Sequence, residues 1–412
     1  MSNLSTNRKV LGFIDAWGGG AACAALTLLR RCWPFGGPDE AGRKGLLFLK
    51  LAEQGSTVLA SQAIRDAAER HGAENLYFLV FEENRFILDA LEIIPPENVL
   101  AIRTKGAASM ALSGLGQLFR IRRLRLLACV DLEFFARSTA VIGFLTGIPR
   151  RVGFHGWHSE GPFRGNLFTH RLRYNPHVHT SVIFRSLVAA VDADAQALPR
   201  FDWVAAEEPI TPPAFRATEA EIAKIRGLIK QAAGGTPGSL VLLNANASDL
   251  LPLRKWANEN YVELARRILD EVPDAWIAFT GGPGEREKID ALAATVGRER
   301  VFSMAGRTSL RELLALYAQS DVLVTNDSGP AHFAALTPVD TVVLFGPETP
   351  KLFATLSARN QSLTANLACS PCVSALNNRQ TDCTNNVCMQ RITVAQVFAA
   401  VRNALEHRAK VN

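Results

Sequence analysis

Cysteine is scarce in this chain, and long uninterrupted apolar runs are absent. Seven cysteines among 412 residues are too few for a disulfide-stapled secreted scaffold. The N-terminus does not show, in order, the basic region, apolar region and small-residue cleavage site of a signal peptide. We therefore expect a reduced, cytoplasmic protein.

The longest candidate membrane segment covers residues 21–29, well short of the roughly 20 apolar residues that a spanning helix requires. Trp17 precedes this segment, and Arg30, Arg31 and Trp33 follow it. Tryptophans near both ends and a cationic edge predict an interfacial helix on a membrane surface. The alternative is a helix packed on the N-terminal domain.

Composition predicts a globular protein but leaves its partner open. With 48% hydrophobic and 20% charged residues, the chain is too apolar to be disordered and long enough for two domains. Its formal net charge is +6 and its pI is near 9.0. An excess of positive charge suits an anionic partner, which could be nucleic acid, a phosphorylated sugar or a membrane headgroup layer.

Strand-like and helix-like segments alternate along most of the chain, which predicts a doubly wound α/β fold. The predicted strands are residues 46–50, 76–81, 99–102, 126–130, 239–244, 276–280, 322–325 and 341–345. The predicted helices are residues 58–71, 134–146, 261–270, 285–296 and 330–336. Residues 199–213 are rich in proline and show little periodicity, as expected for a linker between domains.

We therefore predict two Rossmann-like domains with additions at both ends. Residues 1–44 form an N-terminal extension that contains the possible interfacial helix. Residues 45–205 form the first Rossmann-like domain and residues 215–395 the second. Residues 396–412 form a terminal helix.

Residues 321–347, DVLVTNDSGPAHFAALTPVDTVVLFGP, give the strongest chemical signal, because they predict a strand, a sharp turn, a helix and a second strand. Asp327 or Ser328 can cap the helix, and Pro330 suits its first turn. Gly329 permits close approach of a ligand. Backbone N–H groups at such a turn, on the carboxyl edge of a parallel sheet, predict a site for phosphate or diphosphate.

His332 lies in the first turn of the same predicted helix. It could donate a hydrogen bond to a phosphate oxygen or a sugar hydroxyl, or be a partly buried histidine bonded to backbone. The whole segment resembles the signature of glycosyltransferase family nine, the bacterial lipopolysaccharide heptosyltransferase family. In that family D-[ST]-G-x-x-H precedes a strand that ends in F-G-P. The matching residues are Asp327, Ser328, Gly329, His332, Phe345, Gly346 and Pro347.

The resemblance continues upstream and assigns further donor-binding residues. Residues 241–256, VLLNANASDLLPLRKW, resemble the strand, small-polar loop and basic-x-tryptophan stretch that open the family's C-terminal domain. By this likeness Asn246 and Ser248 face the donor. Arg254 or Lys255 would meet its diphosphate, where the leaving nucleotide accumulates negative charge. A solvated basic pair ahead of a buried tryptophan is the alternative.

The next predicted strand ends in TGGPGE at residues 280–285, a glycine-rich turn that leads into a helix. The family has a carboxylate near this place that receives nucleotide hydroxyls. Glu285 is the matching residue. A first-turn glutamate that is stabilised by the helix dipole is the alternative.

The N-terminal domain departs from the family's pattern. Residues 46–64 resemble its first strand, glycine turn and first helix, but Gly55 is followed by Ser56. The usual heptosyltransferase form has an aspartate there, thought to act as the base on the acceptor hydroxyl. A serine cannot replace a carboxylate as a proton acceptor at neutral pH. Glu53 is the nearest substitute, and we assign it as the catalytic residue.

Other candidates for the base are Asp131 and Glu133, at the end of the strand predicted over residues 126–130, although both could simply cap the next helix.

Residues 150–179 are rich in Arg, His and aromatic residues, and we expect them to be too polar for the core. In the family this region faces the acceptor, so the resemblance implies a cationic, aromatic surface for an anionic glycolipid. The predicted acceptor-binding residues are Asp131, Arg164 and His177.

No catalytic metal is expected, and the Arg- and His-rich stretch lacks the ligand spacing of a zinc site. Zinc is better suggested by a second group of residues, which has the spacing C-x2-C, ten residues, C-x4-C. These residues are Cys369, Cys372, Cys383 and Cys388. A similar tail in the family is generally not taken as a metal site, which favours a reduced or partly disulfide-linked loop. A zinc ion there would be structural.

The resemblance thus implies an inverting, metal-independent glycosyltransferase of GT-B type, with two Rossmann-like domains across a cleft and no cofactor. It would move a sugar, such as heptose, from a nucleotide-diphosphate-sugar co-substrate to a lipopolysaccharide core or other cell-envelope glycan. We expect peripheral attachment to the inner membrane and no nucleic-acid partner. The alternatives are a non-catalytic nucleotide-sugar or glycolipid binding protein, suggested by Ser56, and a zinc-ribbon nucleic-acid protein.

Overall fold

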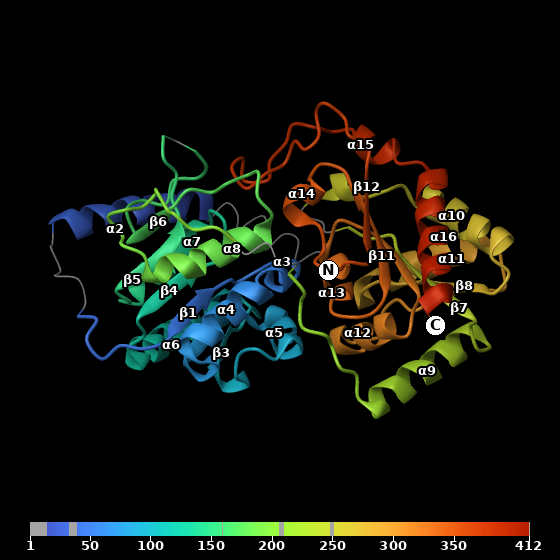
Figure 1. Ribbon diagram of the computed structural model, residues 1–412, viewed down its shortest axis with the longest axis horizontal. Coiled ribbons are helices and arrows are strands. Elements are labelled where there is room, and N and C mark those ends of the chain that lie inside the picture. The colour runs from blue at the N-terminus through green and yellow to red at the C-terminus, as the bar shows by residue number, and fades with distance from the viewer. Residues whose placement is uncertain (1–14, 33–38, 159, 206–209, 248–250, 412) are drawn as a thin grey trace. The chain divides into compact units, whose positions relative to one another are not determined.

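The computed structural model describes residues 15–32, 39–158, 160–205, 210–247 and 251–411 (Figure 1). Contacts within the chain divide it into two compact units. The first unit is Met1–Ile210 together with the short segment Ser374–Gln380, and the second is Thr211–Val373 with Thr381–Asn412. The chain therefore returns to the first unit for a few residues before it ends in the second.

The first unit is built on a six-stranded parallel sheet with the strand order β3-β2-β1-β4-β5-β6. The strands are β1 (Leu46–Leu49), β2 (Leu76–Phe81), β3 (Val99–Ile102), β4 (Ala128–Asp131), β5 (Arg150–Phe154) and β6 (His170–Leu172). β1 is apolar and buried along its whole length because helices cover both faces of the sheet. The strand order reverses between β1 and β4, and doubly wound sheets bind their ligands at such switch points.

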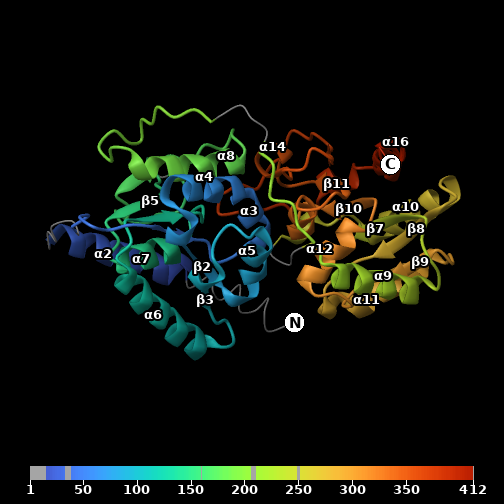
Figure 2. The ribbon, with the colours of Figure 1, turned by 60° about the horizontal axis from the view of Figure 1, so that its bottom comes forward.

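Helices cover this sheet on both sides (Figure 2). α4 packs against α8 on one face, whereas α6 packs on β3 and α7 on β4. α2 packs in turn against α7. The helices are α2 (Gly20–Cys32), α3 (Gln54–Leu59), α4 (Ser61–His71), α5 (Arg85–Leu91), α6 (Ala107–Leu124), α7 (Arg137–Leu145) and α8 (Thr180–Ala189).

The second unit repeats the same architecture. Its parallel sheet has the order β12-β11-β10-β7-β8-β9, which equals the order of the first sheet when the strands are counted within each unit. The switch point lies between β7 and β10. The strands are β7 (Ser239–Asn244), β8 (Ala275–Phe279), β9 (Val301–Ser303), β10 (Val322–Asn326), β11 (Asp340–Phe345) and β12 (Asn360–Thr364).

The core of the second unit is formed by these strands with α10 and α16, which pack against each other. Trp256 is completely buried there and meets Tyr261 edge to face. The helices are α9 (Glu219–Ala233), α10 (Asn258–Glu271), α11 (Arg286–Val296), α12 (Leu310–Ala318), α13 (Gly329–Ala334), α14 (Pro350–Phe353), α15 (Val387–Gln390) and α16 (Val394–Val411).

The predicted fold class of two Rossmann-like α/β domains is confirmed, but one local prediction about helix capping is wrong. Ser328 occupies the N-cap position of α13 without capping it. Its hydroxyl instead donates to the Asn326 carbonyl at 3.1 Å. This bond fixes the turn after β10 rather than the first turn of the helix.

The N-terminal segment forms the helix α2. Cys23 on its inner side is completely buried, and the Asn166 amide donates to Thr27 Oγ1 at 2.9 Å, so the helix is anchored to the first unit. The Trp17 side chain and Trp33 lie outside the described residues. Across the part of the chain that the structure describes, no helix has both the length and the apolar character needed to cross a membrane.

Candidate active site

The residues predicted to bind the donor follow the carboxyl ends of neighbouring strands in the second unit. Asn246 follows β7, Glu285 follows β8 and Asp327 follows β10. Because these strands are parallel, their ends meet at one edge of the sheet, and β7 and β10 flank the switch point. The structure therefore brings these side chains to the place where this fold binds ligands.

Asn326 holds the loops at this edge together. Its side-chain amide donates to the Asn246 carbonyl at 3.0 Å, and its Oδ1 accepts from the Trp256 amide at 3.1 Å. Asn326 is completely buried, so both bonds are shielded from water. The sequence pattern alone does not reveal this role of Asn326, although the residue directly precedes Asp327.

Asn246 has an unusual environment at the switch point. Its side-chain nitrogen Nδ2 is buried and has no hydrogen-bond partner among the described residues. A buried amide donor without a partner is costly, by about 1–3 kcal/mol, and is rare in folded proteins. A bound ligand with an acceptor oxygen would satisfy it, which fits the predicted role in donor binding.

Arg254 lies between two carboxylates at the same edge. It pairs closely with Glu348, and its Nε lies 3.6 Å from Asp327 Oδ2. It also donates to the Asp327 carbonyl at 3.4 Å. Of the predicted basic pair, Arg254 joins this cluster, whereas Lys255 is exposed. Glu348 directly follows the F-G-P sequence, but no sequence pattern predicts that it joins this cluster.

Burial raises the pKa of Glu348 to about 8, and the nearby Asp327 carboxylate adds to this shift while Arg254 opposes it. Glu348 therefore holds its proton more tightly than an ordinary glutamate does, which lowers the negative charge beside Arg254 near neutral pH. An anionic diphosphate could approach this cluster without meeting two full negative charges.

The raised pKa of Glu348 predicts a loss of stability as pH rises from 4.5, the ordinary pKa of a glutamate, to about 8. The folded state holds the proton more tightly than the unfolded state, so the unfolding free energy falls as pH rises towards 8. Glu348→Gln can keep the hydrogen bond to Arg254 but cannot ionise. We expect the unfolding free energy of this variant to decrease less between pH 6 and pH 9. Urea unfolding of both proteins at pH 6 and pH 9 tests this, and parallel losses in both would contradict it.

The remaining predicted donor residues lie around this cluster. Glu285 is half-buried, and its Oε2 accepts from the Gly282 amide at 2.7 Å, which fixes the glycine-rich turn after β8. His332 is buried within α13. Gly329 is the first residue of that helix, and a side chain at this position would meet the Phe333 ring. Ser248 lies outside the described residues.

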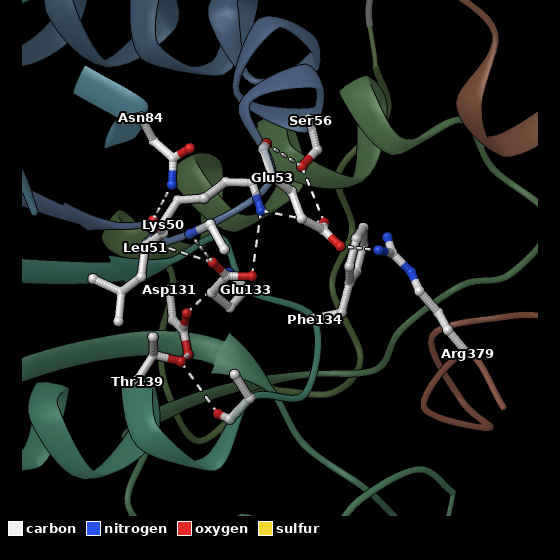
Figure 3. A network of polar contacts seen from close by, with 12 residues as sticks. Lys50, Leu51, Glu53, Ser56, Asn84, Asp131, Glu133, Phe134, Thr139 and Arg379 are labelled. Carbon is white, nitrogen blue, oxygen red and sulfur yellow. Dashed lines mark hydrogen bonds and ion pairs between the residues drawn. The ribbon is translucent and has the colours of Figure 1, made fainter. Parts of the chain in front are cut away.

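In the first unit, polar side chains gather at the β1/β4 switch point (Figure 3). Lys50 follows β1 and is completely buried, with its ammonium 3.3 Å from Glu133 Oε2 and 3.8 Å from Glu53 Oε2. Burial lowers the pKa of Lys50, and Glu133 partly offsets this. Glu133 also accepts from the Leu51 and Ala52 amides at 2.9 and 3.1 Å. Glu133 therefore supports the loop, which leaves Glu53 as the better candidate for a base.

Glu53 is held in a conformation that is uncommon for a residue with a side chain. Its φ is 64°, in the left-handed region. Its carboxylate pairs with Arg379 and accepts from the Ser56 hydroxyl at 3.3 Å. The Arg379 guanidinium also lies over the Phe134 ring, 5.9 Å from its centre (Figure 3). Backbone strain of this kind costs about 1–3 kcal/mol, so the contacts of the Glu53 carboxylate must hold the residue in place.

The predicted acceptor residues have different environments. Asp131 and Arg164 are buried and form an ion pair with each other, and Thr139 donates to Asp131 at 2.9 Å. This burial supports a role in holding the domain together. His177 is exposed just before α8. The expectation that residues 150–179 are too polar for the core is wrong, because Arg164, Arg151 and His170 are all buried.

The buried arginines and histidine of this stretch are accommodated by hydrogen bonds. Arg151 donates to the Leu167 carbonyl at 2.8 Å, and Thr169 Oγ1 lies 2.9 Å from the His170 ring nitrogen. A polar side chain can be buried at little cost in free energy when its polar atoms are hydrogen-bonded, as they are here. The exposed residues of the stretch include His158, Arg173 and His177.

Removal of the Asp131 carboxylate is expected to destabilise the first unit strongly. Asp131→Ala leaves the Arg164 charge buried without its partner, at a cost of about 3–5 kcal/mol. A matched control is Glu160→Ala, because Glu160 and Arg173 form an exposed pair at 3.5 Å worth about 0–1 kcal/mol. Urea unfolding measures both. Equal small losses would show that the buried pair contributes little.

None of the four C-terminal cysteines is joined in a disulfide, and Cys372 Sγ accepts from the Thr381 hydroxyl at 3.5 Å. Cys369 and Cys383 are exposed, whereas Cys372 and Cys388 are half-buried. Burial raises the pKa of Cys388, and Cys372 and Cys383 add to that shift. Over the described residues, no group of three or more His, Cys, Asp or Glu side chains is arranged to hold a metal ion.

Comparison with curated proteins finds heptosyltransferases. The chain is 25% identical over 228 residues to lipopolysaccharide heptosyltransferase 2 of Escherichia coli strain K12, which covers 53% of this chain and 60% of that protein. It is 26% identical over 226 residues to lipooligosaccharide heptosyltransferase 2 of Haemophilus influenzae, with the same coverage of 53% and 60%. The matched region thus spans 60% of the length of these relatives.

Solved structures show a similar fold over nearly their whole length. The ADP-heptose lipopolysaccharide heptosyltransferase II of E. coli superposes with a TM-score of 0.65 at 18% identity, covering 89% of this chain and 99% of that one. A family 9 glycosyltransferase from Veillonella parvula gives 0.68 at 16% identity, with 90% and 99% covered. The model of glycosyltransferase family 9 (heptosyltransferase) matches residues 136–381. This match covers more than half of the sequence, and the chain belongs to glycosyltransferase family 9.

Proposed function

We propose that this chain is a glycosyltransferase that moves a heptose from ADP-heptose to a lipopolysaccharide core. Two of the solved relatives are named for ADP-heptose or were solved with ADP, and the curated relatives are lipopolysaccharide or lipooligosaccharide heptosyltransferases. The observation that supports the proposal best is the convergence of Asn246, Arg254 and Asp327 beside the β7/β10 switch point.

The donor would bind to the second unit at this switch point. Asn246 offers a buried amide donor to a donor oxygen, and Arg254 offers the positive charge that the departing ADP requires. Asp327 and Glu348 hold the guanidinium in place, so it is preorganised. Glu285 and His332 would contribute hydrogen bonds to the nucleotide and the sugar. The same contacts support a mechanism that needs no metal ion.

Glu53 would take the proton from the acceptor hydroxyl as that oxygen attacks the anomeric carbon. The new bond forms as the bond from that carbon to the ADP oxygen breaks, and attack from the opposite face inverts the configuration. The carboxylate of Glu53 is fixed by Arg379, Lys50 and Ser56. A guanidinium, an ammonium and a neutral hydroxyl cannot act as the base, so this role is left to Glu53. His177 would contact the acceptor glycan. We propose that the enzyme works at the inner-membrane surface.

Nucleotide binding tests the donor part of the proposal. The purified chain is heated alone and with ADP, UDP, GDP, CDP or dTDP. A ligand at 100 times its Kd stabilises the folded state by about 2.7 kcal/mol, so the preferred nucleotide raises the Tm. We expect the largest rise with ADP. A rise with another nucleotide alone would replace ADP in the proposal, and no rise with any of the five would contradict a nucleotide-sugar donor.

A further inference from the structure

The outward side of α6 carries an apolar stripe. Leu112, Leu115 and Phe119 are 72%, 52% and 60% exposed. Their spacing places them on one side of the helix together with Ala108. The opposite side packs inward through Ile121, which is 1% exposed. This helix therefore has two apolar sides, one buried and one exposed. A surface helix of a soluble domain normally turns polar residues outward.

The same segment carries a concentrated positive charge. Residues 103–127 contain six Arg or Lys residues and no Asp or Glu. All six side chains are exposed, and within the described part of the chain none of them forms an ion pair. Arg120 and Arg122 each donate to a backbone carbonyl at 2.9 Å, which holds the end of the helix but leaves its charge uncompensated.

α7 and α2 follow α6 on this side of the first unit. Arg122 of α6 donates to the carbonyl of Leu145 at the end of α7, and α7 packs against α2. α2 exposes Leu28 and Leu29, and its last turn carries Arg30 and Arg31. α2, α7 and α6 lie on the same side of the first sheet (Figure 2). Exposed apolar side chains beside arginines thus occur on two helices of one face.

We propose that the outward side of α6, together with the exposed leucines of α2, docks on an anionic lipid bilayer. Leu112, Leu115 and Phe119 enter the boundary between headgroups and acyl chains, while the arginines contact lipid phosphates. A second copy of the chain fits this surface poorly, because it would bring two sets of unpaired cations together. The inference rests on the proposed function, which already includes work at the inner-membrane surface, and it names the residues that make the contact.

Vesicle sedimentation of the full chain tests the proposal without donor or acceptor. The vesicles are phosphatidylcholine alone or phosphatidylcholine mixed with phosphatidylglycerol. We expect binding to the anionic vesicles that weakens at high salt, and about tenfold weaker binding by Leu112→Glu/Phe119→Glu, since both apolar contacts are lost. Val204→Glu is the matched control, because Val204 is 84% exposed and lies outside these helices; it should bind like the unaltered chain.

The outcomes separate the possible occupants of the surface. An unaltered chain that stays in the supernatant with both vesicles overturns the proposal, as does a double variant that binds as well as the control. Size-exclusion chromatography is run in parallel: a dimer that the double variant converts to a monomer, without vesicle binding, would assign the surface to a second copy. Leu28→Glu/Leu29→Glu should also weaken binding. Transfer activity is not measured here, so failure of the proposed reaction would leave these results unchanged.

Discussion

Replacement of Glu53 by glutamine is expected to lower the rate of sugar transfer by about 10²- to 10⁴-fold, the range that a general base contributes. Glutamine keeps the size of the side chain and can still accept hydrogen bonds from Arg379 and Ser56. It cannot take a proton at neutral pH. The measurement is kcat with ADP-heptose and acceptor at saturation, and the ADP-induced rise in Tm should persist because the donor residues lie in the second unit.

A matched control for this substitution is Glu92→Gln. Glu92 is also a glutamate with a left-handed backbone, with φ of 53°, but it ends α5 and is exposed. It should transfer sugar at the unaltered rate. A Glu53→Gln protein with near-normal kcat would show that the base lies elsewhere. Loss of folding in this variant, seen as an early melting transition, would instead point to a structural role for the Arg379 pair.

Replacement of Asp327 by alanine is expected to abolish the stabilisation by ADP. The Asp327 carboxylate holds Arg254 from one side, and its loss frees the guanidinium to turn towards Glu348. The site then loses its preorganised cation. The measurement is the Tm of the variant with and without ADP, at nucleotide concentrations that stabilise the unaltered chain.

Asp340→Ala controls for the general cost of removing a buried carboxylate. Asp340 is buried and pairs with Arg408 at 3.5 Å, but it lies at the opposite end of β11 from the site. Both variants should melt earlier than the unaltered chain. Only the Asp327 variant should fail to respond to ADP. If the two respond equally, Asp327 does not take part in donor binding.

The second unit was the more predictable half because its signals are local. Asp327 and Gly329 fall between two clearly apolar strands, so the turn and its position in the sheet follow from a few neighbouring residues. Glu285 and Asn246 likewise follow predicted strands. Asn326 and Glu348 were missed because their roles depend on partners in the segment between β7 and α10: Trp256 for Asn326 and Arg254 for Glu348. No pattern within their own segments shows those contacts.

The first unit was less predictable because its polar residues are paired across long stretches of sequence. Lys50 at the end of a strand suggests a solvated lysine, yet Glu133 permits its complete burial. Arg164 similarly enters the interior because it pairs with Asp131. Arg379 meets Glu53 from 326 residues away, in a segment without periodicity. Proximity in the fold, which composition and spacing do not reveal, decides the role of each of these residues.

The helix α6 was absent from the sequence prediction for a related reason. Gly114 and Gly116 lie in its interior, and glycine there costs about 1 kcal/mol relative to alanine. No side chain caps its first turn, and its apolar residues occur on two sides rather than one. The pattern that normally predicts an amphipathic helix was therefore missing. The second apolar side is the feature from which we infer contact with a bilayer.

The most direct test of the proposed reaction is the transfer itself. The unaltered chain is incubated with ADP-heptose and a panel of truncated lipopolysaccharide cores, and the mass of each acceptor and the release of ADP are followed together. We predict one heptose added to a matching acceptor for each ADP released, and neither product with Glu53→Gln or Asp327→Ala. Binding of ADP without transfer to any core acceptor would contradict the account and favour a protein that only binds the nucleotide-sugar.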